Sequence, residues 1–216
     1  MRADAAEDQP ADDIEGSELF GGPKRTLYVV RHGKYESISR PPDDPDGPLT
    51  EMGAQQAALT AERLRGQPIS AIHCSTLQRA RETAEIIARC FPGVEARPSP
   101  LLCECIPSVP PLIKDYLERQ IPAAELVAGP AQARAAWATY FQPPEDDADD
   151  AQIIVSSGNL ISYLVARALG APDDAWIQAD IQHGGLTEII VSQRRGAILI
   201  RHNDTGHLPP ALRTFV

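Results

Sequence analysis

Short runs of β-branched and other apolar residues recur along the chain, each ended by polar residues, glycine or proline. Such runs are typical of strands, and they predict strands at 26–30, 69–73, 152–155, 186–191 and 197–201. Longer segments carry apolar residues every three to four positions, which is typical of helices with one buried face. They predict helices at 50–65, 76–90, 112–142 and 159–169, with breaks in the third at Pro122 and at Gly129-Pro130.

The order of these elements predicts the fold class. Strands that alternate with helices form a sheet with helices on both faces. The last two strands flank a polar turn at 192–196 and are expected to pair as an antiparallel hairpin at the edge of the sheet. The sequence therefore predicts an α/β fold of three layers, α/β/α, around a mostly parallel mixed sheet.

Charge and length change this picture at the N-terminus. Residues 1–22 are rich in Asp and Glu and poor in large apolar residues, so this acidic tail is expected to be disordered. The remaining residues, 23–216, suit a single domain in length. The formal net charge of −10 opposes general nucleic-acid binding, which needs a basic surface.

Targeting signals and cysteine content bear on the location. No apolar stretch reaches the length of a membrane span, and the N-terminus lacks the pattern of a secretory signal. The four cysteines are too irregularly spaced for a disulfide framework, so a reducing, cytoplasmic location is expected. A metal site built from Cys103-Glu104-Cys105 and His73-Cys74 would lack the paired ligand spacing of zinc sites. No metal and no cofactor are therefore expected, and the oligomeric state is left open.

Polar residues follow three of the predicted strands. Arg31-His32-Gly33 ends the first strand, Cys74-Ser75 the second, and Ser156-Ser157-Gly158 the third. Because ligands of open α/β sheets bind beyond the carboxyl ends of the parallel strands, these turns are expected to converge.

Arg79, at the start of a predicted helix, adds a second guanidinium to this edge. A neutral imidazole flanked by two arginines suits a phosphoryl group, since guanidinium forks bind its oxygens and the imidazole can attack phosphorus. The alternative is that Arg31 and His32 are simply polar residues that end a strand, and that Arg79 is a surface arginine.

Several segments together resemble the histidine phosphatase superfamily, also called the phosphoglycerate-mutase-like fold. The matching stretches, in chain order, are VVRHG, LTEMGAQQAALTAERL, HCSTLQRARETAEII, LLCE, SGNLISYLVARALG and NDTGHLP. Within the superfamily, the chain looks most like the mitochondrial Ser/Thr protein phosphatases of the phosphoglycerate-mutase family. A glycerate mutase is not expected, because residues 34–38 do not match the mutase signature.

The resemblance implies phosphomonoester hydrolysis with a phosphorylated protein or a small phosphoester as substrate. His32 would be the nucleophile that forms a phosphohistidine. Arg31 and Arg79 would hold the phosphate oxygens, and Glu104 would be the general acid. Two positions depart from the family pattern. Cys103 replaces an arginine beside the acid, and Ser157 replaces the second histidine.

Ser157 can still contribute to phosphate binding, but only with a short, neutral donor, so reduced activity is expected. The loss of one preorganised donor commonly lowers the rate by about 10²–10³-fold. The alternative is a pseudophosphatase that acts as a phosphate-binding or scaffolding module. Two further histidines, His183 and His207, could approach the site.

Overall fold

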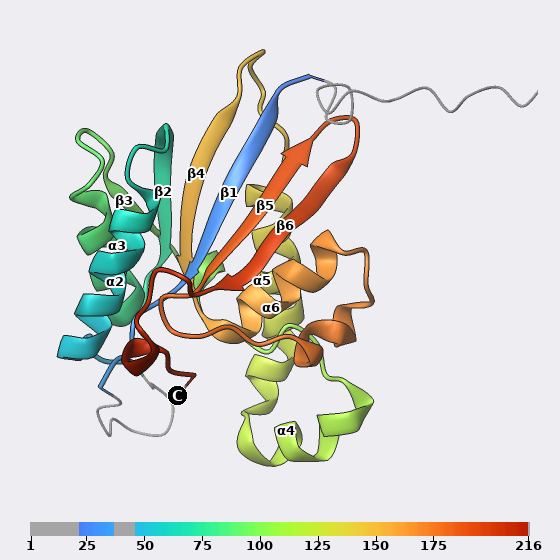
Figure 1. Ribbon diagram of the computed structural model, residues 1–216. Coiled ribbons are helices and arrows are strands. Elements are labelled where there is room, and N and C mark those ends of the chain that lie inside the picture. The colour runs from blue at the N-terminus through green and yellow to red at the C-terminus, as the bar shows by residue number, and fades with distance from the viewer. Residues whose placement is uncertain (1–21, 37–45, 216) are drawn as a thin grey trace, which may run out of the picture.

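The apolar runs of the sequence form the strands of one mixed sheet (Figure 1). The protein is described by a computed structural model over residues 22–36 and 46–215. In these residues the sheet has six strands in the order β3-β2-β4-β1-β5-β6. Their bounds are β1 Lys24–Arg31, β2 Ile69–Ser75, β3 Ala96–Ser99, β4 Asp150–Ser156, β5 Leu186–Ser192 and β6 Gly196–Asp204. The strands β3, β2, β4 and β1 are mutually parallel, whereas β5 and β6 are antiparallel to their neighbours, as the sequence predicted.

Helices cover both faces of this sheet (Figure 1). On one face lie α2 and α3, and on the other α5 and α6, which confirms the three-layer α/β/α prediction. The bounds are α2 Glu51–Leu64, α3 Gln78–Ala88, α4 Lys114–Gln120, α5 Ala123–Tyr140 and α6 Gly158–Ala168. Short 3₁₀ helices span η1 Pro100–Leu102, η2 Pro111–Ile113, η3 Asp173–Gln178 and η4 Pro210–Leu212. None of the described helices combines the length and apolar composition needed to cross a bilayer.

Strand β1 is apolar throughout its centre because it faces two cores. Successive side chains of a strand point to opposite faces. Val29 accordingly packs in the cluster that contains Leu160 of α6, and Val30 in the cluster that contains Ile87 of α3. Since β1 is central in the sheet, it fixes the residue that follows it, His32, at the middle of the sheet edge.

Two glycines bring the chain after β1 against the start of α2. A Cβ on Gly33 would lie 2.4 Å from the carbonyl oxygen of Gly53, and a Cβ on Gly53 would lie 1.9 Å from that of Lys34. Neither position therefore has room for a side chain. Thr50 caps α2 by accepting a hydrogen bond from the Gly53 N–H. The turn that carries His32 is thus clamped to a helix end.

The structure corrects two predictions of secondary structure. Helix α5 runs through Gly129-Pro130 without ending, whereas a break was expected there. The reason is tertiary packing. A Cβ at Gly129 would lie 2.2 Å from the Ile106 carbonyl oxygen, so glycine lets this helix lie against the 102–106 loop. Strand β3 was missed because its four residues, ARPS, are partly exposed and lack an apolar pattern. The acidic tail predicted at 1–22 lies, apart from Gly22, outside the described residues.

Candidate active site

The carboxyl ends of β1, β2 and β4 bring the predicted site residues to one edge of the sheet. The His32 N–H donates a hydrogen bond to the Ser156 carbonyl oxygen (3.0 Å), which joins the end of β1 to the end of β4. The Gly33 N–H donates to Thr83 Oγ1 (3.0 Å), which joins the same turn to α3. The predicted convergence of these turns is therefore observed in the described residues.

The imidazole of His32 is buried and neutral, with a defined tautomer. Its Nε2 lies 3.0 Å from Nε of Arg79, a group that can only donate, so Nε2 must carry the lone pair. The proton then resides on Nδ1 and is donated to the Gly33 carbonyl oxygen (2.9 Å). Burial, followed by the positive charge of Arg79, lowers the pKa of His32 well below its ordinary value. The ring can therefore act as a nucleophile through Nε2 at neutral pH.

Arg79 lies under an aromatic ring and against a carboxylate. Its side chain is 3% exposed, and its guanidinium carbon lies 4.5 Å from the centroid of the Tyr35 ring. Its NH1 is 3.4 Å from Oδ1 of Asp46, whose other oxygen accepts a hydrogen bond from the Gln78 N–H. Arg79 is thus not the exposed surface residue of the alternative interpretation. Sequence reasoning missed Tyr35 and Asp46, because neither position carries a local signal beyond its nearness to His32.

Arg31 and Ser157 each present a buried polar atom without a hydrogen-bond partner among the described residues. These atoms are Nε of Arg31 and Oγ of Ser157. The other end of the Arg31 guanidinium is held by the Ile181 carbonyl oxygen. The guanidinium packs against the start of α6, since a Cβ on Gly158 would lie 3.6 Å from its central carbon, an ordinary van der Waals contact. Buried polar atoms almost always have partners, so both atoms are available to donate to a ligand that enters this edge.

Glu104 approaches the same edge from the loop after η1. The Ser156 hydroxyl donates to the Leu102 carbonyl oxygen (2.8 Å), and Nε2 of Gln132 donates to that of Cys103 (2.8 Å), which fix this loop. Loss of hydration by the surrounding protein raises the pKa of Glu104, while the positive charges of Arg79 and Arg31 oppose the rise. Glu104 is nonetheless exposed to solvent by its accessible surface. A carboxyl group in this position can exchange protons with water and with a ligand.

The cysteines near the site are structural in character. Cys103 Sγ lies 3.3 Å from the Ser75 hydroxyl and 3.1 Å from that of Thr76, at the end of β2. Burial raises the pKa of Cys74 to about 11 and that of Cys105 to about 12, so both remain protonated thiols at neutral pH.

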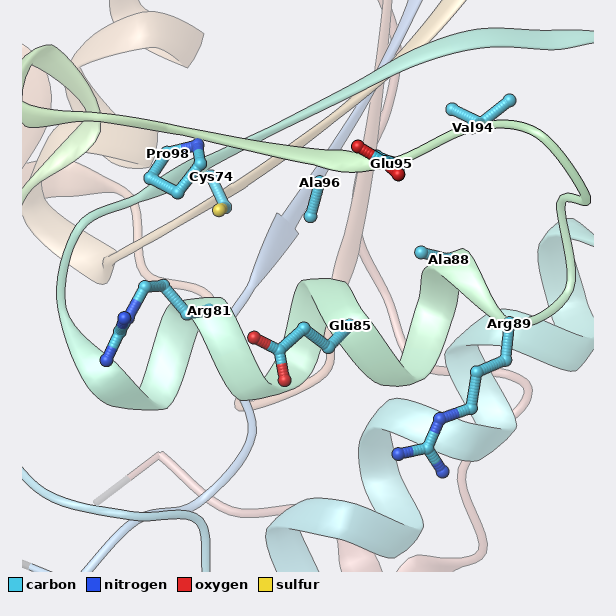
Figure 2. A pocket seen from close by; sticks show the side chains of 9 residues that line it. All are labelled: Cys74, Arg81, Glu85, Ala88, Arg89, Val94, Glu95, Ala96 and Pro98. Atoms are coloured by element: carbon cyan, nitrogen blue, oxygen red, sulfur yellow. The ribbon is translucent and has the colours of Figure 1, made fainter.

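A separate surface hollow of about 510 Å³ lies between α3 and β3 (Figure 2). Its lining includes Arg81 and Glu85 of the exposed side of α3 and Arg89 just after the end of that helix, and the buried Cys74 lies beneath it. His32, Arg79 and Glu104 do not line this hollow. It therefore provides charged residues that can serve as controls without touching the site.

The two other histidines considered from the sequence have different positions. His183 reaches the site, with its ring centroid 5.5 Å from that of His32. His207 instead places Nε2 3.1 Å from both Thr60 Oγ1 and the Gly184 carbonyl oxygen, on the side of α2. The sequence could not separate them, because their distance from His32 depends on how the last third of the chain packs.

Comparisons with known proteins show which family the chain resembles. The family model described as "Histidine phosphatase superfamily (branch 1)" matches residues 27–106. The serine/threonine-protein phosphatase PGAM5, mitochondrial, of Xenopus tropicalis is 31% identical over 86% of this chain and 66% of its own length. The protein of the same description from Caenorhabditis briggsae is 31% identical over 88% of this chain and 67% of its own length. A solved structure of phosphoglycerate mutase from Plasmodium falciparum is 25% identical, with a TM-score of 0.58 over 87% of this chain and 96% of that one.

These comparisons confirm one expectation and correct another. The fold is phosphoglycerate-mutase-like, as the resemblance implied. The cytoplasmic location expected from the sequence is wrong, because the matching relatives are named as mitochondrial proteins. Composition and cysteine count cannot distinguish the cytoplasm from another reducing compartment, which is why that inference failed. The chain spans about two thirds of the length of these relatives, 66% and 67% for the two named above.

Proposed function

The chain belongs to the histidine phosphatase superfamily, and from this premise we propose that it hydrolyses phosphomonoesters through a phosphohistidine at His32. One observation carries the proposal. The Nε2 lone pair of His32 lies beside the Arg79 guanidinium, and the edge also holds two buried polar atoms, on Arg31 and Ser157, that lack a partner among the described residues. A phosphoryl group supplies the oxygens that these donors need and the phosphorus that the lone pair can attack.

In the first step, Nε2 of His32 attacks phosphorus in line with the leaving oxygen. The N–P bond forms as the P–O bond breaks, and the leaving oxygen takes the proton of Glu104. Arg31, Arg79 and Ser157 donate to the non-bridging oxygens, on which negative charge is concentrated. The ring keeps its Nδ1 proton and donates it in a hydrogen bond to the Gly33 carbonyl oxygen. This hydrogen bond stabilises the positive charge of the phosphorylated imidazole.

In the second step, water attacks phosphorus on the side away from His32. Glu104, now a carboxylate, takes the water proton as the O–P bond forms. The N–P bond breaks, its electron pair returns to Nε2, and inorganic phosphate leaves. Phosphoserine and phosphothreonine esters are the proposed substrate class, supported by the names of the relatives, and small phosphoesters remain within this chemistry.

The role of Glu104 predicts a dependence on the leaving group. For Glu104→Gln we expect kcat/KM to fall by about 10²–10⁴-fold on a phosphoserine peptide, the usual contribution of general acid catalysis. On p-nitrophenyl phosphate the loss should be much smaller, because nitrophenolate leaves without a proton. The measurement compares kcat/KM for both substrates, since this constant covers the steps up to departure of the leaving group.

Glu95→Gln is the matched control for this change. Glu95 lines the hollow between α3 and β3 (Figure 2) and should leave both rates unchanged. An equal loss on the two substrates in Glu104→Gln would contradict the proposed acid.

A second candidate function is phosphate binding without useful turnover. It is favoured by the neutral hydroxyl of Ser157 and the thiol of Cys103 at positions where the family resemblance places charged donors. We expect instead that the wild type turns over p-nitrophenyl phosphate at a reduced rate, and that Ser157→His raises kcat/KM by up to about 10²–10³-fold, the effect of one restored donor. A silent wild type that Ser157→His activates would establish the pseudophosphatase.

A further inference from the structure

His183 is held beside His32 by backbone hydrogen bonds to two other parts of the chain. Its N–H donates to the Thr214 carbonyl oxygen (2.8 Å), near the C-terminus. The next two residues pair with the end of β1, since the Gly184 N–H donates to the Arg31 carbonyl oxygen (3.0 Å) and the Arg31 N–H donates to that of Gly185 (3.2 Å). The side chain is 2% exposed. The imidazole is therefore fixed at the sheet edge and not free to rotate in solvent.

A chain of hydrogen bonds sets the tautomer of this imidazole. The Lys34 N–H donates to Oε1 of Gln56 (2.8 Å), which fixes the orientation of the Gln56 amide. Its Nε2 then donates to the Leu212 carbonyl oxygen (2.7 Å) and to Thr214 Oγ1 (3.1 Å).

The Thr214 hydroxyl accepts that bond and has one proton to donate, for which Nδ1 of His183 lies within reach (3.0 Å). A neutral imidazole carries one proton. With Nδ1 as the acceptor, the proton of His183 is on Nε2. With the Thr214 hydroxyl as donor to Nδ1, this arrangement favours His183 as an Nε2–H donor.

The charges around His183 keep it neutral before a ligand binds. Burial, followed by the positive charges of Arg31, Lys34 and Arg79, lowers its pKa to about 3. No hydrogen bond to its Nε2 is found among the described residues. An oxyanion beside His32 would satisfy this donor together with Arg31 Nε and Ser157 Oγ.

We propose that His183 is a further catalytic residue, whose Nε2–H donates to a non-bridging oxygen of the phosphoryl group during its transfer to and from His32. The proposal rests on the proposed function and assigns to position 183 a donor that reaches the site from the loop before β5. Thr214 is the positioning residue, because its hydroxyl holds the proton of His183 on Nε2. No bond to His183 forms or breaks in either step.

The kinetic test removes the donor and then replaces it. For His183→Ala we expect kcat/KM for p-nitrophenyl phosphate to fall by about 10²–10³-fold, as for loss of one preorganised donor. His183→Gln places an amide N–H near the former Nε2 and should recover much of this loss. Thr214→Val should lower kcat/KM although His183 is present. Thr214→Ser keeps the hydroxyl and should have the kcat/KM of the wild type. Wild-type kcat/KM in His183→Ala, with His32→Ala inactive, would overturn the role of His183 and leave the proposed function intact.

A second test does not depend on turnover. Long-range ¹H–¹⁵N spectra of the imidazoles should show His183 protonated on Nε2 in the free protein. Titration with inorganic phosphate should shift this Nε2–H signal, and Thr214→Val should alter the tautomer. A proton on Nδ1, or no response to phosphate, would contradict the assignment. If wild-type turnover does not depend on His32, the proposed function fails, and this titration still decides whether His183 contacts the anion.

Discussion

His32→Ala should lower kcat/KM for p-nitrophenyl phosphate by roughly 10⁴–10⁶-fold, the range that follows removal of a group at the centre of covalent catalysis. The reason is that Nε2 of His32 is the atom proposed to bond to phosphorus, and no other group can take that position. His32→Asn is a second variant. Its amide can still donate to the Gly33 carbonyl oxygen, as Nδ1 of His32 does now, so it separates loss of the nucleophile from loss of the local fold.

The control for these variants is His73→Gln. His73 lies on β2 and packs against Tyr140, with ring centroids 4.9 Å apart and the ring planes tilted by 56°, outside the candidate site. We expect kcat/KM of His73→Gln for p-nitrophenyl phosphate to equal that of the wild type. Turnover that persists undiminished in both His32 variants would remove the basis of the proposed function.

Arg79→Gln should lower kcat/KM by about 10²–10³-fold and weaken binding of inorganic phosphate. The variant loses the guanidinium that donates to His32 Nε2 and that is proposed to hold the phosphate oxygens. It should also raise the pKa of His32 part of the way to its ordinary value, because Arg79 is the second cause of its depression after burial. The pKa is measured by NMR titration of the imidazole, and phosphate affinity by calorimetry.

Arg81→Gln is the matched control, since Arg81 stands two residues further along α3 and is exposed above the separate hollow (Figure 2). Neither the rate nor the pKa of His32 should change in it. A His32 pKa that is the same in Arg79→Gln as in the wild type would show that the two side chains are not in contact in solution.

The elements that could be predicted from the sequence are those with a strong local pattern. The apolar run before His32 forms β1, and Thr50 caps α2, because burial of an apolar face and capping both depend on near neighbours in the chain. Helix α5 continued through Pro130 because its packing against Ile106 depends on residues distant in sequence. Strand β3 has four residues and no apolar repeat, so no local signal existed for it.

Some residues of the candidate site could likewise be predicted from the sequence, and others could not. Arg31 and His32 could be predicted because they directly follow a strand, and Arg79 because it begins a helix next to the same edge. The position of His183 could not, since it depends on hydrogen bonds to Thr214, 31 residues away, and on the Gln56 amide of α2. Ser157 was correctly placed at the end of β4, but the partnerless state of its hydroxyl follows only from the packed structure.

Capture of the covalent intermediate tests the central claim most directly. The protein is mixed with a ³²P-labelled phosphoester, quenched in alkali within milliseconds, digested and mapped. We predict an alkali-stable, acid-labile label on the peptide that contains His32, absent from His32→Asn. Label on any other residue, or equal labelling of His32→Asn, would contradict the account.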